Sequence, residues 1–349
     1  MAWNDFSLPY LTKGIEGIGG TIKETPEDFV VEEIPVYKPA GEGEHLFIHL
    51  TKKGITTREV QKALASLYQV SSRDVNFAGI KDKHAVASQY FSVWVKDQEN
   101  KDLAYQLEEK LPLKINDLSY HRKKIKQGHL LANAFNIKIT RPEYPPEQAI
   151  EHIRPIIETI HRKGLPNYYG YQRFGIEGNN AQKGYEILMG RRKEPNKWFR
   201  RFLLSAYQSN LFNHYLARRI QQGLYEKILK GDVAKKHDTG GIFVVEHADM
   251  EQERLTNKEI CYTGPIFGKK MKSARDEAGA FEEQILTDHQ ITWEDLLSAR
   301  LNGTRRQGII IPTVQAEKEE DGIRLRFTLP KGAYATSVLR EFMKPSHNE

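Results

Sequence analysis

The segment Asn76-Phe-Ala-Gly-Ile-Lys-Asp-Lys-His-Ala-Val86 decides the fold, because it joins two hydrophobic stretches through a polar loop that begins at a glycine. The stretches at 75–78 and 90–95 are rich in the β-branched and aromatic residues that favour strands. Between them, Gly79 to His84 forms a polar exit from the first strand. Rigid strands often position functional side chains on such loops, so we expect chemistry here.

Further strands are predicted before and after this loop. In residues 44–50, Leu46, Ile48 and Leu50 share one face, as expected of a strand with one buried side. The other predicted strands are 29–34, 135–139, 309–311 and 323–329.

Helical patterns dominate the middle of the chain. An early helix is predicted at 56–68, where Thr56 and Glu59 form a capping box ahead of an apolar stripe. From about residue 149 the strand patterns give way to helices, whereas the last segments return to strands. The later predicted helices are 150–161, 183–189 and 202–221. This order is typical of a domain inserted into another, so we expect the final strands to join the first sheet.

The sequence carries a formal net charge of +6 over 349 residues, and its positive charge is clustered. Such a protein is either simply well solvated or binds a polyanion, since lysine and arginine displace counterions from phosphates. Three clusters far apart in the sequence favour a broad nucleic-acid footprint. They are Arg122, Lys123, Lys124, Lys126, Lys138 and Arg141; Arg191, Arg192, Lys193, Lys197, Arg200 and Arg201, with Trp198 and Phe199 among them; and Lys269, Lys270, Lys272 and Arg275.

Several kinds of protein and of chemistry find no support in the sequence. Cys261 is the only cysteine, which excludes an intramolecular disulfide and a thiolate metal cluster. Residues 1–10 lack the pattern of a signal peptide, and no stretch of about 18 apolar residues predicts a membrane span. The sequence contains no HExxH or GxSxG motif, and its glycine-rich segment at 14–20 lacks the GxGxxG spacing. We therefore expect a cytoplasmic protein without a metal or an organic cofactor.

Asp82 is the strongest candidate for a catalytic residue in the loop. It lies between Lys81 and Lys83, and neighbouring cations keep a carboxylate ionised by lowering its pKa. An ionised carboxylate can act as a nucleophile or a general base. The same pattern also fits a loop aspartate in a surface salt bridge, and His84 is either a second base or a solvated loop residue.

The loop is one of a series of motifs that resembles the TruD family of tRNA pseudouridine synthases. The segment 76–86, followed by Gln89, resembles the family's active-site motif, and Pro166-Asn-Tyr-Tyr-Gly-Tyr-Gln-Arg-Phe-Gly175 resembles its most recognisable signature. The motifs occur in family order across nearly the whole chain, and Ala87 departs from the threonine of some members. The other matching segments are Lys23-Glu-Thr-Pro-Glu-Asp-Phe29, Gly41-Glu-Gly-Glu-His45, Asn133-Ala-Phe135, and Leu329-Pro-Lys-Gly-Ala-Tyr-Ala-Thr336 with Arg340 and Glu341.

The resemblance implies an α+β fold made of two domains. One is a pseudouridine-synthase catalytic domain with a mixed, mostly antiparallel sheet, expected over residues 1–153 and 307–349. The other is an inserted, helix-rich α/β TRUD domain, expected over residues 154–306. This organisation agrees with the partition drawn from the strand and helix patterns.

The resemblance also implies roles for individual residues. Asp82 matches the catalytic aspartate, Lys23 the basic residue that pairs with it, and Phe135 the aromatic residue that stacks on the target uracil. For Asn133 and Gln89, orienting the uracil and bracing the loop are alternatives. The expected substrate-binding residues are Phe135, Phe29, Asn133, Gln89 and Lys81, and the expected RNA-binding residues are Arg173, Lys123, Lys124, Arg191 and Arg192.

The activity implied is the isomerisation of uridine to pseudouridine in tRNA, at uridine 13 of the D-arm. An aspartate nucleophile would act on a flipped-out base without a cofactor. Attack at C1′, attack at C6 and formation of a glycal remain open routes. The competing functions are an RNA-base glycosylase or methyltransferase and a non-catalytic RNA-binding protein. The expected partner is tRNA, with no membrane and no metal, and the expected state is a monomer.

Overall fold

The structure, a computed structural model, describes residues 8–95 and 98–344 and packs into two compact units. Of the described residues, the sheet unit comprises those in 16–161, 312–332 and 342–344. The helical unit comprises those in 8–15, 162–311 and 333–341. The predicted absence of a signal peptide rests mostly on residues 1–7, which lie outside the described residues, so it stays a prediction.

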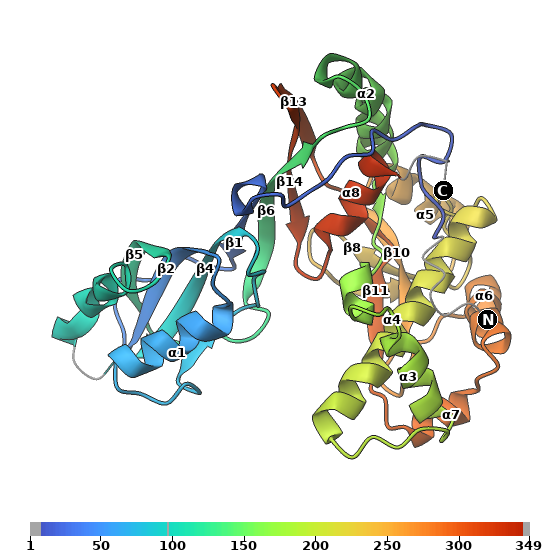
Figure 1. Ribbon diagram of the computed structural model, residues 1–349. Helices are drawn as coiled ribbons and strands as arrows, with labels where there is room; N and C mark the ends of the chain where they lie inside the picture. The colour runs from blue at the N-terminus through green and yellow to red at the C-terminus, as the bar shows by residue number, and fades with distance from the viewer. Residues whose placement is uncertain (1–7, 96–97, 345–349) are drawn as a thin grey trace. The chain divides into compact units, whose positions relative to one another are not determined.

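One eight-stranded sheet organises the sheet unit (Figure 1). Its order is β13-β14-β6-β1-β4-β2-β5, with β3 paired to β4 off this path. β1 and β4 run parallel, and the other neighbouring strands run antiparallel. The strands are β1 (Phe29–Pro35), β2 (His45–Lys53), β3 (Val75–Phe77), β4 (Val86–Trp94), β5 (Leu113–His121), β6 (Leu130–Thr140), β13 (Val314–Glu319) and β14 (Gly322–Pro330). The predicted mixed sheet is confirmed, and the predicted strand 323–329 returns to it as β14. The expectation for the predicted strand 309–311 is wrong, because β12 (Ile309–Ile310) pairs with β7 (Leu165–Pro166) in a separate two-stranded sheet of the helical unit.

Helix α1 (Thr57–Leu67) packs on the sheet beside β3 and β4 and starts where the sequence predicts. The Thr56 side chain accepts from the Glu59 N–H, and the Glu59 carboxylate accepts in return at 2.8 Å from the Thr56 N–H. Val60 and Leu64 of α1 are fully buried with residues of β2 and β4. The other helices of this unit are the 3-10 turns η1 (Pro26–Asp28) and η2 (Gln98–Leu107) and the helix α2 (Pro146–Lys163), whose last two residues belong to the helical unit.

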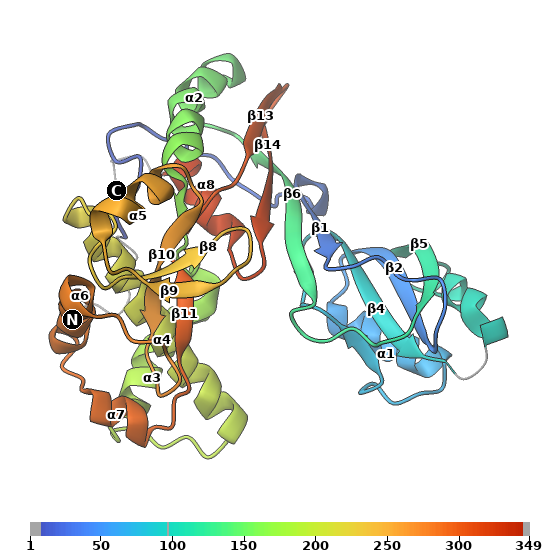
Figure 2. The same ribbon diagram turned by 180° about the vertical axis from the view of Figure 1, so that it is seen from behind.

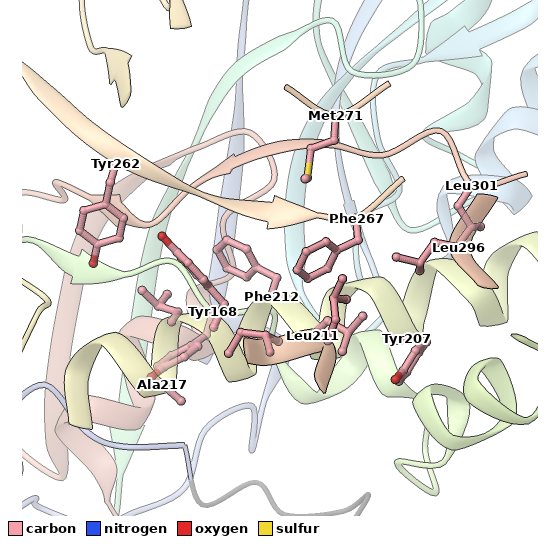
Figure 3. Packing of buried hydrophobic residues seen from close by; sticks show 14 of the residues in the cluster. Tyr168, Tyr207, Leu211, Phe212, Ala217, Tyr262, Phe267, Met271, Leu296 and Leu301 are labelled. Carbon is pink, nitrogen blue, oxygen red and sulfur yellow. The ribbon is translucent and has the colours of Figure 1, made fainter. Parts of the chain in front are cut away.

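The helical unit is built around α4 (Lys197–Gln221), which packs against β10 (Ile260–Ile266) (Figure 2). Figure 3 shows Leu211 and Phe212 of α4 in a buried cluster with Phe267 and Met271. The four-stranded sheet has the order β11-β10-β8-β9, and β7 pairs with β12. The other elements are β7 (Leu165–Pro166), η3 (Tyr171–Phe174), α3 (Asn180–Leu188), β8 (Val233–Lys236), β9 (Ile242–Val244), α5 (Ala248–Thr256), α6 (Asp276–Asp288), α7 (Trp293–Ser298), β11 (Thr304–Gln307), β12 (Ile309–Ile310) and α8 (Ala335–Met343).

A fully buried ion pair ties α4 to the start of β8. The Arg219 guanidinium donates to both oxygens of Asp232, at 2.8 and 2.9 Å, and neither side chain is exposed. Arg219 also donates to the Tyr215 hydroxyl at 2.7 Å and lies 3.7 Å from the ring centre of Tyr262. Since the carboxylate is the only anion that reaches it in the described chain, Arg219 depends on Asp232 for its burial.

The units divide the chain at 161/162 and 311/312, and they place residues 333–341 in the helical unit. The expected domains, 1–153 with 307–349 and 154–306, are defined by family resemblance rather than by packing, and their edges stay a prediction. Within the two described ranges, no helix is both long enough and apolar enough to cross a membrane.

Candidate active site

The predicted loop, residues 79–84, joins the antiparallel neighbours β3 and β4 and presents Asp82 to solvent. The Asp82 side chain is 40% exposed. Its Oδ2 accepts from Lys23 Nζ, and its Oδ1 accepts from the His84 N–H at 3.0 Å. Burial acts to raise the pKa of Asp82, but the hydrogen bonds from Lys23 and His84 outweigh it and hold that pKa below its usual range. The loop therefore carries an ionised, oriented carboxylate.

Lys23 reaches Asp82 from a tight turn before η1. Its φ is +61°, in the left-handed region that residues with a β-carbon rarely adopt. The amine lies 4.3 Å from the ring centre of Phe29 and forms an ion pair with Asp82. A strained backbone at a charged contact of this kind is common at functional sites.

The Phe29 ring, which contacts Lys23, lies on the same face of the sheet as a second phenylalanine ring, Phe135. Phe29 on β1 and Phe135 on β6 meet edge to face, with ring centres 6.1 Å apart and an interplanar angle of 76°. Phe135 also stacks on Phe327 of β14, at 5.3 Å and 26°. Phe135 is half-buried, so one part of its ring is packed and another faces solvent. The structure thus brings the predicted residues Asp82, Lys23, Phe29 and Phe135 together.

A buried charged network lies beside these rings. Lys81 Nζ is 2.9 Å from Glu33 Oε2 and donates at 2.6 Å to Asn133 Oδ1. Glu33 and Asn133 are register partners on β1 and β6, which places both on the face that carries Phe29 and Phe135. Burial raises the pKa of Glu33, and the charge of Lys81 opposes that rise. Lys81 is therefore held by protein groups on the inner side of the loop.

Gln89 braces the loop from below. It is fully buried on β4, where its Oε1 accepts from the Thr57 hydroxyl at 2.9 Å. The same hydroxyl accepts from the Lys81 N–H at 2.9 Å, so Gln89, Thr57 and the loop form one chain of hydrogen bonds. Of the two predicted alternatives for Gln89, these contacts favour bracing over contact with a substrate.

Acidic residues from elsewhere in the sequence neutralise half of the first basic cluster. Arg122 pairs with Glu42, Arg141 pairs with Glu24, and Lys138 pairs with Glu319 and Asp321. Lys123, Lys124 and Lys126 are exposed and have no carboxylate within 4 Å in the described chain. The predicted RNA-binding pair Lys123 and Lys124 thus belongs to the part of the cluster that is left unpaired.

The second basic cluster lies at the start of α4 and in the turn before it. Arg192 lies 3.6 Å from Glu186, and the guanidinium of Arg191 lies 5.6 Å from the ring centre of Tyr185. Trp198 is 72% exposed and stacks on Phe202, with ring centres 5.7 Å apart and 7° between the planes. Of the predicted RNA-binding residues, Arg191 and Arg192 lie here.

Arg173 fastens η3 to α4. Its guanidinium donates to the hydroxyls of Ser205 at 2.7 Å and Ser209 at 3.2 Å, and it lies 5.6 Å from the ring centre of Phe202. These contacts describe a packing role, and its predicted contact with RNA stays a prediction.

Metal and thiol chemistry have no evident centre here. In residues 8–95 and 98–344, no group of three or more His, Cys, Asp or Glu side chains is placed to hold a metal ion. Burial raises the pKa of Cys261 to about 11, so its thiolate is scarce near neutral pH.

Three residues of the site were not predicted from the sequence: Glu33, Thr57 and Lys52, whose amine donates at 2.6 Å to the carbonyl of Asp82. The strand pattern contained a signal for one of them, because Leu46, Ile48 and Leu50 alternate on the buried face and the next step is Lys52. The predicted strand ended at residue 50, whereas β2 continues to Lys53. A lysine in register with buried leucines is the feature that would have identified it.

Comparison with known proteins finds matches to one protein family. The sequence model of the family described as tRNA pseudouridine synthase D (TruD) matches residues 6–199 and 193–342. A tRNA pseudouridine synthase D of Thermus thermophilus is 41% identical over 338 residues, covering 96% of this chain and 92% of the relative. That of Anaeromyxobacter sp. (strain Fw109-5) is 38% identical over 345 residues, covering 96% of each chain.

A solved structure shares the fold. The crystal structure of a Methanosarcina mazei chain assigned to tRNA pseudouridine synthase D (TruD) matches with a TM-score of 0.77 at 24% identity. The match covers 97% of this chain and 96% of the other.

Proposed function

We propose a residue-level mechanism for this chain, which belongs to the tRNA pseudouridine synthase D (TruD) family and is an isomerase that forms pseudouridine in tRNA. In this mechanism Asp82 is the nucleophile, and it acts on a uridine that has left the base stack. The observation that carries the proposal is the Asp82 carboxylate, which is ionised, half-exposed and held at both oxygens. Its partner Lys23 contacts the Phe29 ring, and that ring meets Phe135.

The reaction needs a group that acts either as a nucleophile toward carbon or as a base toward a sugar proton. The C1′–N1 bond of uridine breaks, the uracil turns, and C5 bonds to C1′, while C5 loses a proton and N1 gains one. Atoms and electrons balance within the nucleotide. A carboxylate in the position of Asp82 can attack C1′, attack C6, or remove a sugar proton to give a glycal. Each of these routes requires its ionised form.

Lys23 is proposed to keep Asp82 ionised and aimed. Its amine contacts Oδ2, so Oδ1, which receives only the His84 N–H, is the oxygen left to approach the substrate. Lys23 is also positioned to balance negative charge that returns to the carboxylate when the bond to carbon breaks.

Phe135 is proposed to receive the extruded uracil. Extrusion from a stacked helix costs a few kcal/mol, and stacking a base on an aromatic ring is worth about 1–3 kcal/mol. Phe327 and Phe29 pack against the Phe135 ring and fix its plane before a base arrives. Asn133, held through Lys81, is proposed to meet the polar edge of the uracil or to keep the loop in place.

Exposed cations of the first two basic clusters are proposed to bind the tRNA backbone. Lys123 and Lys124 in the sheet unit and Arg191 and Arg192 in the helical unit are exposed. Contacts of this kind release counterions and bind structured RNA through its backbone rather than its sequence. They supply the binding energy that offsets the extrusion of the base.

The proposed target is uridine 13 in the D-arm, and one experiment tests target and nucleophile together. Purified wild-type protein and Asp82→Asn are incubated with an unmodified tRNA pool without added cofactor, and pseudouridine is mapped. We expect pseudouridine at position 13 with the wild type alone. Pseudouridine at another position would refute the target, and equal activity of Asp82→Asn would refute the nucleophile. Equal tRNA binding by both proteins without any product would favour a binding protein.

A further inference from the structure

Lys52 is a fully buried lysine without a carboxylate partner. It lies on β2, where Leu46, Ile48, Leu50 and Lys52 follow one another on the face buried under α1. In the described residues no carboxylate lies within 4 Å of its amine. Lysine is almost never buried completely unless it is paired, because an ammonium loses its hydration there. The position therefore requires an explanation.

The amine of Lys52 donates hydrogen bonds to two backbone carbonyls. It donates at 2.8 Å to the carbonyl of Ile55, in the turn before α1, and at 2.6 Å to the carbonyl of Asp82. The second acceptor belongs to the same residue whose side chain is the proposed nucleophile. We infer that Lys52 is a positioning residue, which fixes the backbone of Asp82 from beneath so that its carboxylate keeps the orientation needed for attack.

The contacts around the loop support this role, because they hold Asp82 from different sides. The Thr57 hydroxyl fixes the Ile80–Lys81 peptide by accepting from the Lys81 N–H at 2.9 Å. Lys23 holds the side chain, and Lys52 holds the carbonyl that follows it. Without Lys52, the peptide between Asp82 and Lys83 would have no protein donor on its carbonyl among these contacts and could turn with the exposed part of the loop.

The surroundings of Lys52 also shift its pKa. Burial lowers the pKa of Lys52 to about 8, while the charges of Asp82 and Glu59 act to raise it and that of Lys81 acts to lower it. Below about pH 8 the amine is an ammonium that attracts the carbonyl dipole strongly. Above that pH the amine becomes neutral, and its hydrogen bonds to the two carbonyls weaken. A positioning role through this amine thus gives the reaction an alkaline limb that starts near pH 8.

Lys52→Met tests the inference, since methionine fills the same space without the amine. Lys53→Met is the matched control, because Lys53 is the next residue, points out of the core and pairs with Glu27 at the surface. For Lys52→Met we expect the single-turnover rate at saturating tRNA to fall by about 10- to 100-fold, as for a misplaced reacting group. The dissociation constant for tRNA should change less than twofold, and Lys53→Met should match the wild type in both measurements.

The melting temperature distinguishes a positioning role of Lys52 from a role in stabilising the fold. Removing the buried ammonium relieves its lost hydration but leaves two carbonyls without a donor, so the opposing effects keep the melting temperature within about 5 °C of the wild type. The alkaline limb should disappear in Lys52→Met. In Lys52→Arg it should move to higher pH, because guanidinium stays protonated.

Each outcome decides the inference one way or the other. A rate within twofold of the wild type, a rate loss that follows the unfolded fraction, or an alkaline limb that persists in Lys52→Met would each overturn it. If Lys52→Met does not fold, an unchanged limb in Lys52→Arg overturns it and a shifted limb supports it. The inference rests on the proposed role of Asp82, yet the two can fail separately. An active Asp82→Asn refutes that role, whereas a fully active Lys52→Met beside an inactive Asp82→Asn refutes only the role of Lys52.

Discussion

Replacing Lys23 by methionine removes the cation from the Asp82 carboxylate while leaving the backbone demand of the turn unchanged. Both residues carry a β-carbon, so the cost of the left-handed φ of +61° is similar in the two proteins. Asp82 keeps its second contact, the His84 N–H at 3.0 Å from Oδ1. The substitution therefore tests the charge and the hydrogen bond of Lys23 rather than the fold of the loop.

The expected size of the effect follows from what remains. Loss of one preorganised donor to a reacting group typically lowers kcat by about 10²- to 10³-fold. Because the Asp82 side chain is 40% exposed, water replaces part of the lost contact, and we expect the lower end, about 100-fold. The tRNA dissociation constant should change by less than about threefold, since one partly buried lysine contributes little to phosphate binding.

The pH dependence gives the sign of the charge effect. In the wild type, burial acts to raise the pKa of Asp82, and Lys23 is the largest influence that lowers it. Without Lys23 the pKa rises, so the ionised fraction falls at low pH. The acid limb of kcat/KM should therefore move to higher pH, and the ratio of wild-type to variant rates should grow as the pH falls.

Single-turnover pseudouridine formation across this pH range, with tRNA binding measured in parallel, tests the prediction, with Lys53→Met as the control. Equal losses in binding and in rate would contradict the assignment. So would an acid limb that stays where it is in the wild type.

Other substitutions separate the remaining roles. Phe135→Ala should weaken binding of a uridine-containing tRNA by roughly 5- to 150-fold at an unchanged circular dichroism spectrum, and plain unfolding would show that the ring serves only the core. Trp198→Ala, at a side chain that is 72% exposed, should lower RNA affinity by about tenfold without changing the slope of affinity against salt, and a reduced slope would mean lost phosphate contacts instead. Asp232→Asn leaves the buried Arg219 without its anion and should cost about 3–5 kcal/mol in denaturant unfolding, and a loss below about 1 kcal/mol would show that water reaches this pair.

Local sequence patterns predicted the parts of the fold that depend on neighbouring residues. The Thr56–Glu59 box and the alternation in β2 each act within a few residues, so α1 and β2 appear close to where they were expected. The helix predicted at 202–221 corresponds to α4, which begins five residues earlier. The strands β8 to β11 were not predicted. They are three to seven residues long. β8 includes two lysines and β11 two arginines, so for these two strands the pairing rather than the composition makes them strands, whereas β9 and β10 contain strand-forming residues in short runs.

The first basic cluster also shows that local sequence patterns do not predict contacts between residues that are distant in the sequence. Residues 122–141 contain no acid, and as a sequence they form a continuous basic segment. Glu42, Glu24, Glu319 and Asp321 neutralise half of its cations, and all four are distant in the sequence. A cluster read from a linear sequence is therefore an upper bound on the charge that the folded surface offers to RNA.

Three charged residues around Asp82 lie in environments or conformations that lower the stability of the fold. Lys52 is buried without a carboxylate, Glu33 is buried with a raised pKa, and Lys23 holds a left-handed backbone. An apolar side chain at position 52 would fit the leucine stripe of β2 with no desolvation cost, so packing alone does not account for the lysine. What these three residues have in common is that their contacts converge on the 79–84 loop, directly or through Lys81. A loop of exposed polar residues would otherwise sample many conformations, and the cost of these buried groups is offset only if one conformation of the Asp82 carboxylate matters for the reaction.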